Sequence, residues 1–98
     1  MDLNGKVRWS PAKDAALRKR YGFGFDRIVE AIDTGGFLDR RRHPNQERYP
    51  HQWQWIVSID GYVWVVPFVR SDKNVFLKTF FPSRKALREY IGDRNDQD

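Results

Sequence analysis

The chain has 98 residues, enough for one domain with one hydrophobic core, because most domains contain about 50–200 residues. Hydrophobic residues make up 40% and aromatic residues 15%, which excludes a disordered chain. The chain has no cysteine, which excludes disulfides, thiolate metal sites and thiol catalysis. It also has no apolar run near the roughly 20 residues of a membrane-spanning helix and no apolar secretion signal. We expect one cytoplasmic domain over residues 1–92 and a frayed acidic tail over 93–98.

Basic residues outnumber acidic residues by 18 to 13, and the formal net charge at neutral pH is +5. The excess is concentrated in the body, because residues 1–92 hold 17 bases and 10 acids. Such a body attracts phosphate backbones or an acidic protein, although a basic protein without such a partner has the same balance. Most of the bases are arginines, whose planar guanidinium favours bidentate contacts with phosphate.

The first third of the chain predicts a short strand followed by a helical hairpin. Residues 7–9 alternate as in a strand, and Ser10 before Pro11 is typical of a helix start. The first helix is expected over 12–21 and ends at Gly22. A second helix is expected over about 25–34, because its apolar residues recur at spacings of three and four before Gly35. Residues 39–52, with two prolines and a polar lead-in, are expected to form an ordered or mobile loop.

The second half of the chain predicts antiparallel strands. Strands over 53–59 and 62–69 are joined by Asp60-Gly61, a two-residue hairpin turn. The resulting register places tryptophans and branched residues on one face, which must be buried, and a mixed set that includes Gln52 and Gln54 on the other. A third strand is expected over 75–81, and a final helix follows from Arg84 to about Ile91.

The order β-α-α-β-β-β-α predicts an α+β fold with an antiparallel sheet of three to four strands. The helical hairpin is expected to cover the aromatic face of that sheet. The mixed face and the sheet edges then remain as the candidate working surface.

Three short motifs run through the chain: Trp9-Ser10-Pro11-Ala12-Lys13, then Lys19-Arg20-Tyr21-Gly22 followed by Phe25-Asp26, and Phe81-Pro82-Ser83-Arg84-Lys85-Ala86 with Tyr90 beyond. Together with the element order, these motifs resemble the BrnT toxins and, more distantly, the RelE/ParE superfamily of small bacterial toxins. The resemblance implies a RelE/BrnT-like domain that is the toxin component of a type II toxin–antitoxin system, neutralised by a cognate antitoxin. It also implies an endoribonuclease that cleaves mRNA, on the ribosome or free, and so inhibits translation.

Cleavage of RNA requires a group that deprotonates the 2′-hydroxyl, cations that stabilise the phosphate, and an acid for the leaving oxygen. His, Lys, Arg and Tyr supply these functions without a metal. A two-metal nuclease needs paired carboxylates with further ligands around them, and the sequence does not have this pattern. We therefore expect no cofactor. The candidate catalytic residues are Arg84, Lys78, His43, His51 and Tyr90. The candidate RNA-binding residues are Arg41, Arg42, Arg48, Arg70 and Lys85.

Each candidate also has a structural interpretation. Lys78 either projects from an exposed sheet face or extends from an edge towards solvent. Arg84 and Lys85 either contact phosphate at the start of the last helix or are solvated first-turn residues. Tyr90 either packs in the core or acts on RNA, and the arm around His43 contacts RNA, contacts an acidic antitoxin or is flexible. The alternative function is a non-catalytic basic module that binds nucleic acid or a partner, including a ParE-like gyrase poison.

Overall fold

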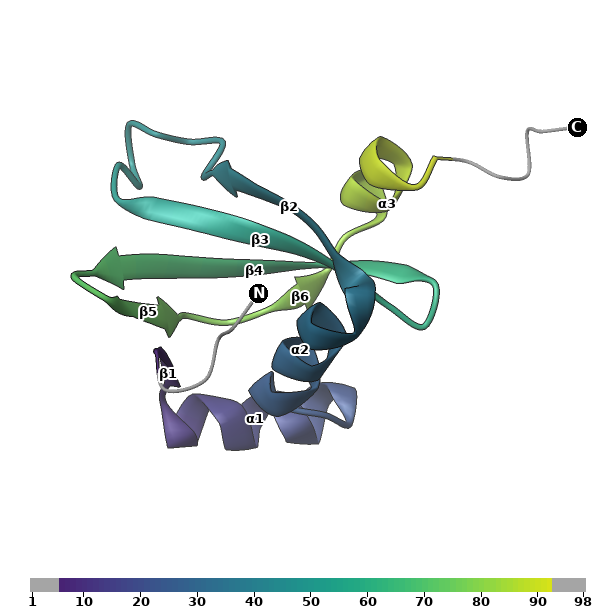
Figure 1. Ribbon diagram of the computed structural model, residues 1–98, viewed down its shortest axis with the longest axis horizontal. Coiled ribbons are helices and arrows are strands. Elements are labelled where there is room, and N and C mark those ends of the chain that lie inside the picture. The colour runs from purple at the N-terminus through teal and green to yellow at the C-terminus, as the bar shows by residue number, and fades with distance from the viewer. Residues whose placement is uncertain (1–5, 93–98) are drawn as a thin grey trace, which may run out of the picture.

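The computed structural model describes residues 6–92, which form an α+β domain with a six-stranded mixed sheet (Figure 1). The strands are β1 (Val7–Trp9), β2 (Phe37–Arg42), β3 (Gln52–Ile59), β4 (Tyr62–Ser71), β5 (Asn74–Leu77) and β6 (Phe81–Pro82). The helices are α1 (Pro11–Tyr21), α2 (Phe25–Ala31), the π-helical turn η1 (Ile32–Gly36) and α3 (Arg84–Tyr90). No helix in this part of the chain is long and apolar enough to cross a bilayer. The acidic tail expected over 93–98 lies outside the described residues.

The sheet has the strand order β1-β5-β4-β3-β2, and β6 pairs with β4. The expected α+β class is correct, but the sheet is larger than the three to four strands expected. Residues 37–42, of which 39–42 were expected in a loop, form the edge strand β2 against β3. The strand expected over 75–81 is divided into β5 and β6, so Lys78 follows a strand rather than lying within one. The pairing of β1 with β5 is parallel, and no local pattern indicates it.

The hairpin formed by β3 and β4 has the register that its turn predicts. Ile59 pairs with Tyr62 across the turn, and Trp55 pairs with Val66 further along the strands. Asp60 and Gly61 have φ values of 51° and 82°, as a two-residue hairpin turn requires. The register therefore places the side chains of Trp53, Trp55, Val57 and Ile59 on one side of β3, which we call the aromatic face.

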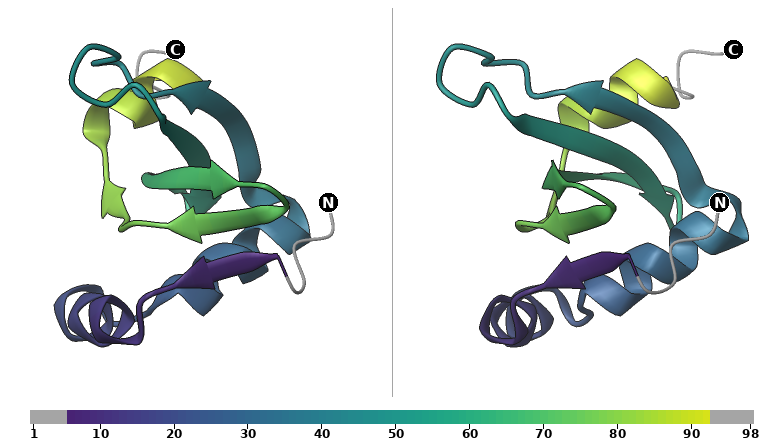
Figure 2. Two further views of the ribbon diagram at one scale, coloured as in Figure 1. Left: turned by 90° about the vertical axis from the view of Figure 1, so that its left-hand side faces the viewer. Right: turned by 60° about the vertical axis from the view of Figure 1, so that its left-hand side comes forward.

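Helices cover both sides of the sheet, with α1 and α2 on the aromatic face and α3 on the other (Figures 1 and 2). The larger core joins α1 and α2 to the aromatic face through the buried residues Leu17, Phe25, Ile28, Trp55, Val57, Phe68 and Phe80. A smaller core joins α3 to the opposite face, which we call the α3 face, through Ile56, Val63, Val65 and Ala86. The α3 face is therefore partly covered rather than left open, because Val63 and Val65 give α3 an apolar surface to bury.

A hydrogen-bonded link fixes the angle between α1 and α2. The Asp14 carboxylate accepts hydrogen bonds from the Phe25 backbone N–H at 2.8 Å and from Arg18 Nε at 2.9 Å. Arg18 also donates to Asp26 at 2.8 Å. Gly24 is buried against this link, where a side chain would collide with the Asp14 carboxylate and lie 2.8 Å from Arg18 Nε. Of the motif between the helices, these contacts involve Phe25 and Asp26, while the basic partner is Arg18 and the glycine packed against it is Gly24.

Candidate nucleic-acid interface

Strand β2 contains a bulge that sets the direction of its side chains. Phe37 pairs with Val57, but Asp39 pairs with Ile56, so Leu38 is the extra residue. A bulge inserts one residue opposite none and changes which face the following residues occupy. Leu38 is consequently 37% exposed although it is apolar.

Beyond the bulge, consecutive arginines of β2 point to opposite faces of the sheet, because strand side chains alternate. Arg40 pairs with Trp55 and Arg42 with Trp53, so both lie on the aromatic face. Their guanidinium carbons lie 5.3 Å and 4.7 Å from the ring centre of Trp53. A guanidinium at this distance is attracted to the indole face, which holds both cations near the surface of the sheet.

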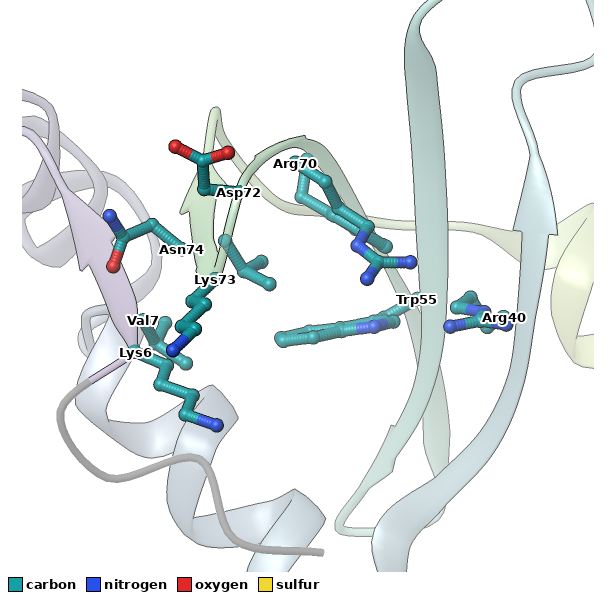
Figure 3. Close-up of a pocket in the computed structure, with 10 residues that line it drawn as sticks. Lys6, Val7, Arg40, Trp55, Arg70, Asp72, Lys73 and Asn74 are labelled. Atoms are coloured by element: carbon teal, nitrogen blue, oxygen red, sulfur yellow. The ribbon is translucent and has the colours of Figure 1, made fainter.

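A hollow of about 350 Å³ opens on the aromatic face beside these arginines (Figure 3). Its floor includes Trp55, whose side chain is almost completely buried. Four cationic side chains line it, one from the residue before β1, one each from β2 and β4, and one from the β4–β5 turn, and we call the site the cationic hollow: Lys6, Arg40, Arg70 and Lys73. Figure 3 shows Arg40 and Arg70 beside the Trp55 indole and the lysines at the opposite side of the opening.

The cationic hollow has an uncompensated positive charge. Among the described residues that line it, Asp72 is the one acidic residue. Within residues 6–92, none of the four cations forms an ion pair with a carboxylate; the ion pairs there involve Arg18, Arg27 and Arg41 instead. Like charges gathered in a concavity focus the electrostatic potential and raise the local concentration of anions. The hollow is therefore suited to an anionic ligand.

Two of the candidate residues, Arg41 and Tyr90, meet on the α3 face rather than in the hollow. The Tyr90 hydroxyl donates to the Asp39 carboxylate at 2.6 Å. Arg41 donates from Nε to the Gln54 side-chain oxygen at 3.0 Å, and from Nη1 to Glu89 at 3.1 Å and to the Tyr90 hydroxyl at 3.4 Å. We call this set of five residues the α3 network.

The α3 network changes the chemistry expected of Tyr90. Burial raises the pKa of the Tyr90 hydroxyl, and its hydrogen bond to Asp39 raises that pKa further, outweighing the nearby charge of Arg41. A phenol with a raised pKa and a bound carboxylate is a poor proton donor to a leaving group. The role of Tyr90 in this structure is to join α3 to β2.

The loop between β2 and β3, residues 43–51, is folded by its own side chains. The His43 ring lies 4.4 Å from the Tyr49 ring, and its Nδ1 accepts a hydrogen bond from the Asn45 N–H at 2.9 Å. The Arg48 guanidinium carbon also lies over the Tyr49 ring, 5.6 Å from its centre. His51 is exposed at the end of the loop. This segment is therefore ordered, with one histidine half-buried and one free to meet a ligand.

The candidates are dispersed over the molecule. The 43–51 loop and the β4–β5 turn lie at one end of the sheet, and α3 lies towards the other end (Figures 1 and 2). Arg84 and Lys85 are exposed at the start of α3, where the Ser83 hydroxyl accepts from the Ala86 N–H at 3.0 Å. The 43–51 loop, which carries both histidines, and α3, which begins at Arg84, therefore lie towards different ends of the sheet.

Lys78 lies apart from the hollow. Its side chain is exposed, with Nζ 5.8 Å from the ring centre of Phe76. The backbone N–H of Lys78 donates to the carbonyl of Pro67 at 2.8 Å, which ties the residue to β4. Lys78 is thus an exposed residue in the segment between β5 and β6, rather than a residue of the sheet.

Sequence reasoning included Arg70 among the RNA-binding candidates and placed Arg40 in a basic cluster with Arg41, Arg42 and Arg48, but it treated Lys73 as a surface charge and did not select Lys6. Lys6 precedes a strand whose partner is distant in sequence, and Lys73 belongs to an ordinary turn. The alternation of residues 40–42 would have indicated Arg40 and Arg42 as a pair, had β2 been recognised as a strand. Within the described residues, no group of three or more histidine and carboxylate side chains is placed to hold a metal ion.

Comparison with known proteins gives no match, whether with protein-family models, curated proteins or solved structures. Functional inference for this chain therefore depends on the geometry described above and on the motifs in its sequence.

Proposed function

We propose that the protein binds RNA in the cationic hollow and is the toxin component of a type II toxin–antitoxin system. The observation that carries this proposal is the group of four cations around Trp55 without carboxylate partners among the described residues. A helical hairpin against a largely antiparallel sheet, together with the three sequence motifs, supports a RelE/BrnT-like fold for the toxin.

The chemistry of the hollow favours a phosphodiester ligand. Arg40 and Arg70 offer planar guanidinium groups that match phosphate oxygens, and Lys6 and Lys73 add mobile charges at the opening. The partly exposed Trp53 and its two arginines extend this surface beyond the hollow. Cationic grooves with aromatic side chains are typical of proteins that bind single-stranded nucleic acids.

We further propose that the protein is a metal-independent endoribonuclease, and that the loop histidines supply its proton transfers. Cations in the hollow would stabilise the charge that develops on the scissile phosphate. Histidine is the side chain that most often acts as general acid or base in catalysis. Because the 43–51 loop lies at the same end of the sheet as the β4–β5 turn, His51 and His43 are the nearest acid–base candidates by topology (Figure 1).

One observation favours the alternative, a module that binds RNA without cleaving it. The described residues that line the hollow include no histidine, so in this structure the cations and the imidazoles do not form one site. In that case RNA is bound with a steep dependence on salt and is recovered intact.

Purified protein incubated with single-stranded RNA in the presence of a chelator tests both functions. We expect cleavage, and we expect Arg40→Ala and Arg70→Ala to abolish it. The matched control is Arg88→Ala, which removes the same charge from the exposed side of α3. Loss of cleavage in His51→Ala with unchanged RNA binding would assign the histidine to proton transfer. Binding that is as tight after both hollow arginines are replaced would refute the proposed site.

The toxin assignment has a separate test in cells. Induced expression is expected to arrest growth, and the cognate antitoxin is expected to restore it when both proteins are made together. Growth arrest that persists in the Arg40→Ala, Arg70→Ala double variant would show that toxicity does not depend on the hollow.

A further inference from the structure

The register in which β2 pairs with β3 determines which residues of β2 face the cationic hollow. Beyond the bulge at Leu38, Arg40 and Arg42 occupy the aromatic face, and Asp39 and Arg41 occupy the α3 face. Because the side-chain period of a strand is two residues, a shift of one residue exchanges the two sets.

A bulge-free register is a realistic competitor. If pairing continued regularly from Phe37 and Val57, Leu38 would pair with Ile56 and bury its exposed side chain on the apolar α3 face. In that register Asp39 would face Trp55. The aromatic face would then receive one carboxylate and Arg41 in place of two arginines, and the cationic hollow would lose its charge excess on this side.

We propose that Tyr90 is a positioning residue that selects the register of β2 and so places Arg40 and Arg42 at the hollow. This inference rests on the proposed RNA-binding function. Tyr90 bonds the Asp39 carboxylate at 2.6 Å and lies 3.4 Å from Arg41 Nη1, so it contacts both residues that the native register directs to the α3 face. In the competing register the contact with Asp39 is lost, because Leu38 takes the place of Asp39, whereas Arg40 takes the place of Arg41.

The rest of the α3 network does not discriminate between the registers. Gln54 is 5% exposed, and its side-chain oxygen accepts from Arg41 Nε at 3.0 Å. In the regular register Arg40 would take the place of Arg41 opposite Gln54 and could donate to the same oxygen. The Asp39 carboxylate has no such substitute, because Leu38 would take its place opposite Ile56, so the Tyr90–Asp39 hydrogen bond is the contact that opposes the burial of Leu38.

Tyr90→Phe tests this role because it removes the hydroxyl and keeps the ring that packs on the sheet. The control is Tyr62→Phe, since the Tyr62 hydroxyl makes no side-chain hydrogen bond with another described residue. The probe is a fluorescent 12-residue oligouridylate, titrated at several salt concentrations. The slope of log K against log salt counts phosphate contacts, at about 0.7 per contact for a single strand.

The native register offers up to five cations on the aromatic face: Lys6, Arg40, Arg42, Arg70 and Lys73. We expect a slope of about −3.5 for the unaltered protein and for Tyr62→Phe, and a slope near −2 for Tyr90→Phe. Cross-strand proton NOEs should pair Arg40 with Trp55 in the first two proteins and with Gln54 in the third. Neither readout changes in a variant that is merely less stable but keeps the native register.

Deletion of Leu38 provides a rescue. Without the extra residue, the regular register itself directs Asp39 to the α3 face and Arg40 to the aromatic face. Tyr90→Phe combined with this deletion should therefore recover a slope near −3.5, although no hydroxyl has been restored.

The outcomes separate the two proposals. If the unaltered protein binds the oligouridylate without dependence on salt, the proposed function fails. If the unaltered protein shows the expected slope and Tyr90→Phe shows the same slope and the same NOEs, the positioning role of Tyr90 is refuted. If Tyr90→Phe does not fold alone, the variant that also lacks Leu38 still decides, because it must bind with the native slope for the inference to stand.

Discussion

Replacement of Asp14 by alanine is expected to destabilise the domain substantially. The Phe25 backbone N–H would lose its acceptor at 2.8 Å, and Phe25 is completely buried. An orphaned buried donor costs about 1–3 kcal/mol. The ion pair with Arg18 adds little, because the Arg18 side chain is 49% exposed and such pairs contribute about 0–1 kcal/mol. We therefore expect a loss of about 2–3 kcal/mol in the free energy of unfolding.

For a chain of this length, each kcal/mol corresponds to a change of about 4–8 °C in Tm, so Asp14→Ala should lower Tm by roughly 10–20 °C. The Tm of Asp14→Asn should fall between that of the unaltered protein and that of Asp14→Ala, because the asparagine amide oxygen still accepts from the Phe25 N–H. The matched control is Asp33→Ala, which removes an exposed carboxylate with no ion pair among the described residues. Thermal and urea unfolding measure all three variants.

The contribution of Asp14 should also depend on pH. Burial alone would raise the pKa of this carboxyl, but the hydrogen bonds from the Phe25 N–H and Arg18 and the Arg18 charge lower it below its ordinary value of 3.8. A lowered pKa in the folded state stabilises the fold above the unfolded pKa, and this stabilisation is lost as the pH falls through the folded value. The difference between the unaltered protein and Asp14→Ala should thus be largest above about pH 5 and shrink below pH 4. The reasoning is refuted if Asp14→Ala is as stable as Asp33→Ala at pH 7. It is also refuted if the difference in stability between the unaltered protein and Asp14→Ala does not change in acid.

Three further outcomes are expected. Gly36→Ala should lower the stability by about 1–3 kcal/mol in urea unfolding, because a Cβ there would lie 2.5 Å from the Ser58 carbonyl oxygen, which is backbone and cannot move aside freely. Spectrophotometric titration should show Tyr90 ionising above the ordinary tyrosine range, since burial raises its pKa. The stabilisation that this raised pKa gives the folded state is lost as the pH rises past about 10. Tyr90→Phe should remove this alkaline loss of stability. In filter binding of single-stranded RNA, Arg40→Glu should weaken binding far more than Arg88→Glu, and equal losses would show that net charge alone governs affinity.

Local patterns in the sequence predicted the helical hairpin and the central hairpin of the sheet. Ser10 was expected to cap the first helix, and its hydroxyl accepts from the Lys13 N–H at 3.2 Å. The turn at Asp60-Gly61 predicted the register of β3 and β4. These features depend on residues near one another in the chain, so propensity, capping and turn chemistry are sufficient to determine them.

Part of the candidate site was also accessible from the sequence, namely the basic character of the body and the inclusion of Arg70. The location of the candidate site could not be predicted from the sequence. Arg84 and the loop histidines, all candidate catalytic residues, could share one site only if α3 packed beside the 43–51 loop, and α3 packs towards the other end of the sheet. The hollow is instead lined by residues of β1, β2, β3, β4 and β5 and of the β4–β5 turn, so it depends on the parallel pairing of β1 with β5.

The sequence by itself determined the excess of positive charge, the aromatic face and the helices that cover it, because each follows from composition or from short-range spacing. Only the tertiary structure decided that residues 37–42 form a strand, that Leu38 is bulged, and that Arg40 faces the hollow while Arg41 faces α3. The physical reason is that three consecutive arginines carry no periodicity of their own. Their directions come from backbone hydrogen bonds to β3 and from contacts with Tyr90, nearly fifty residues further along the chain.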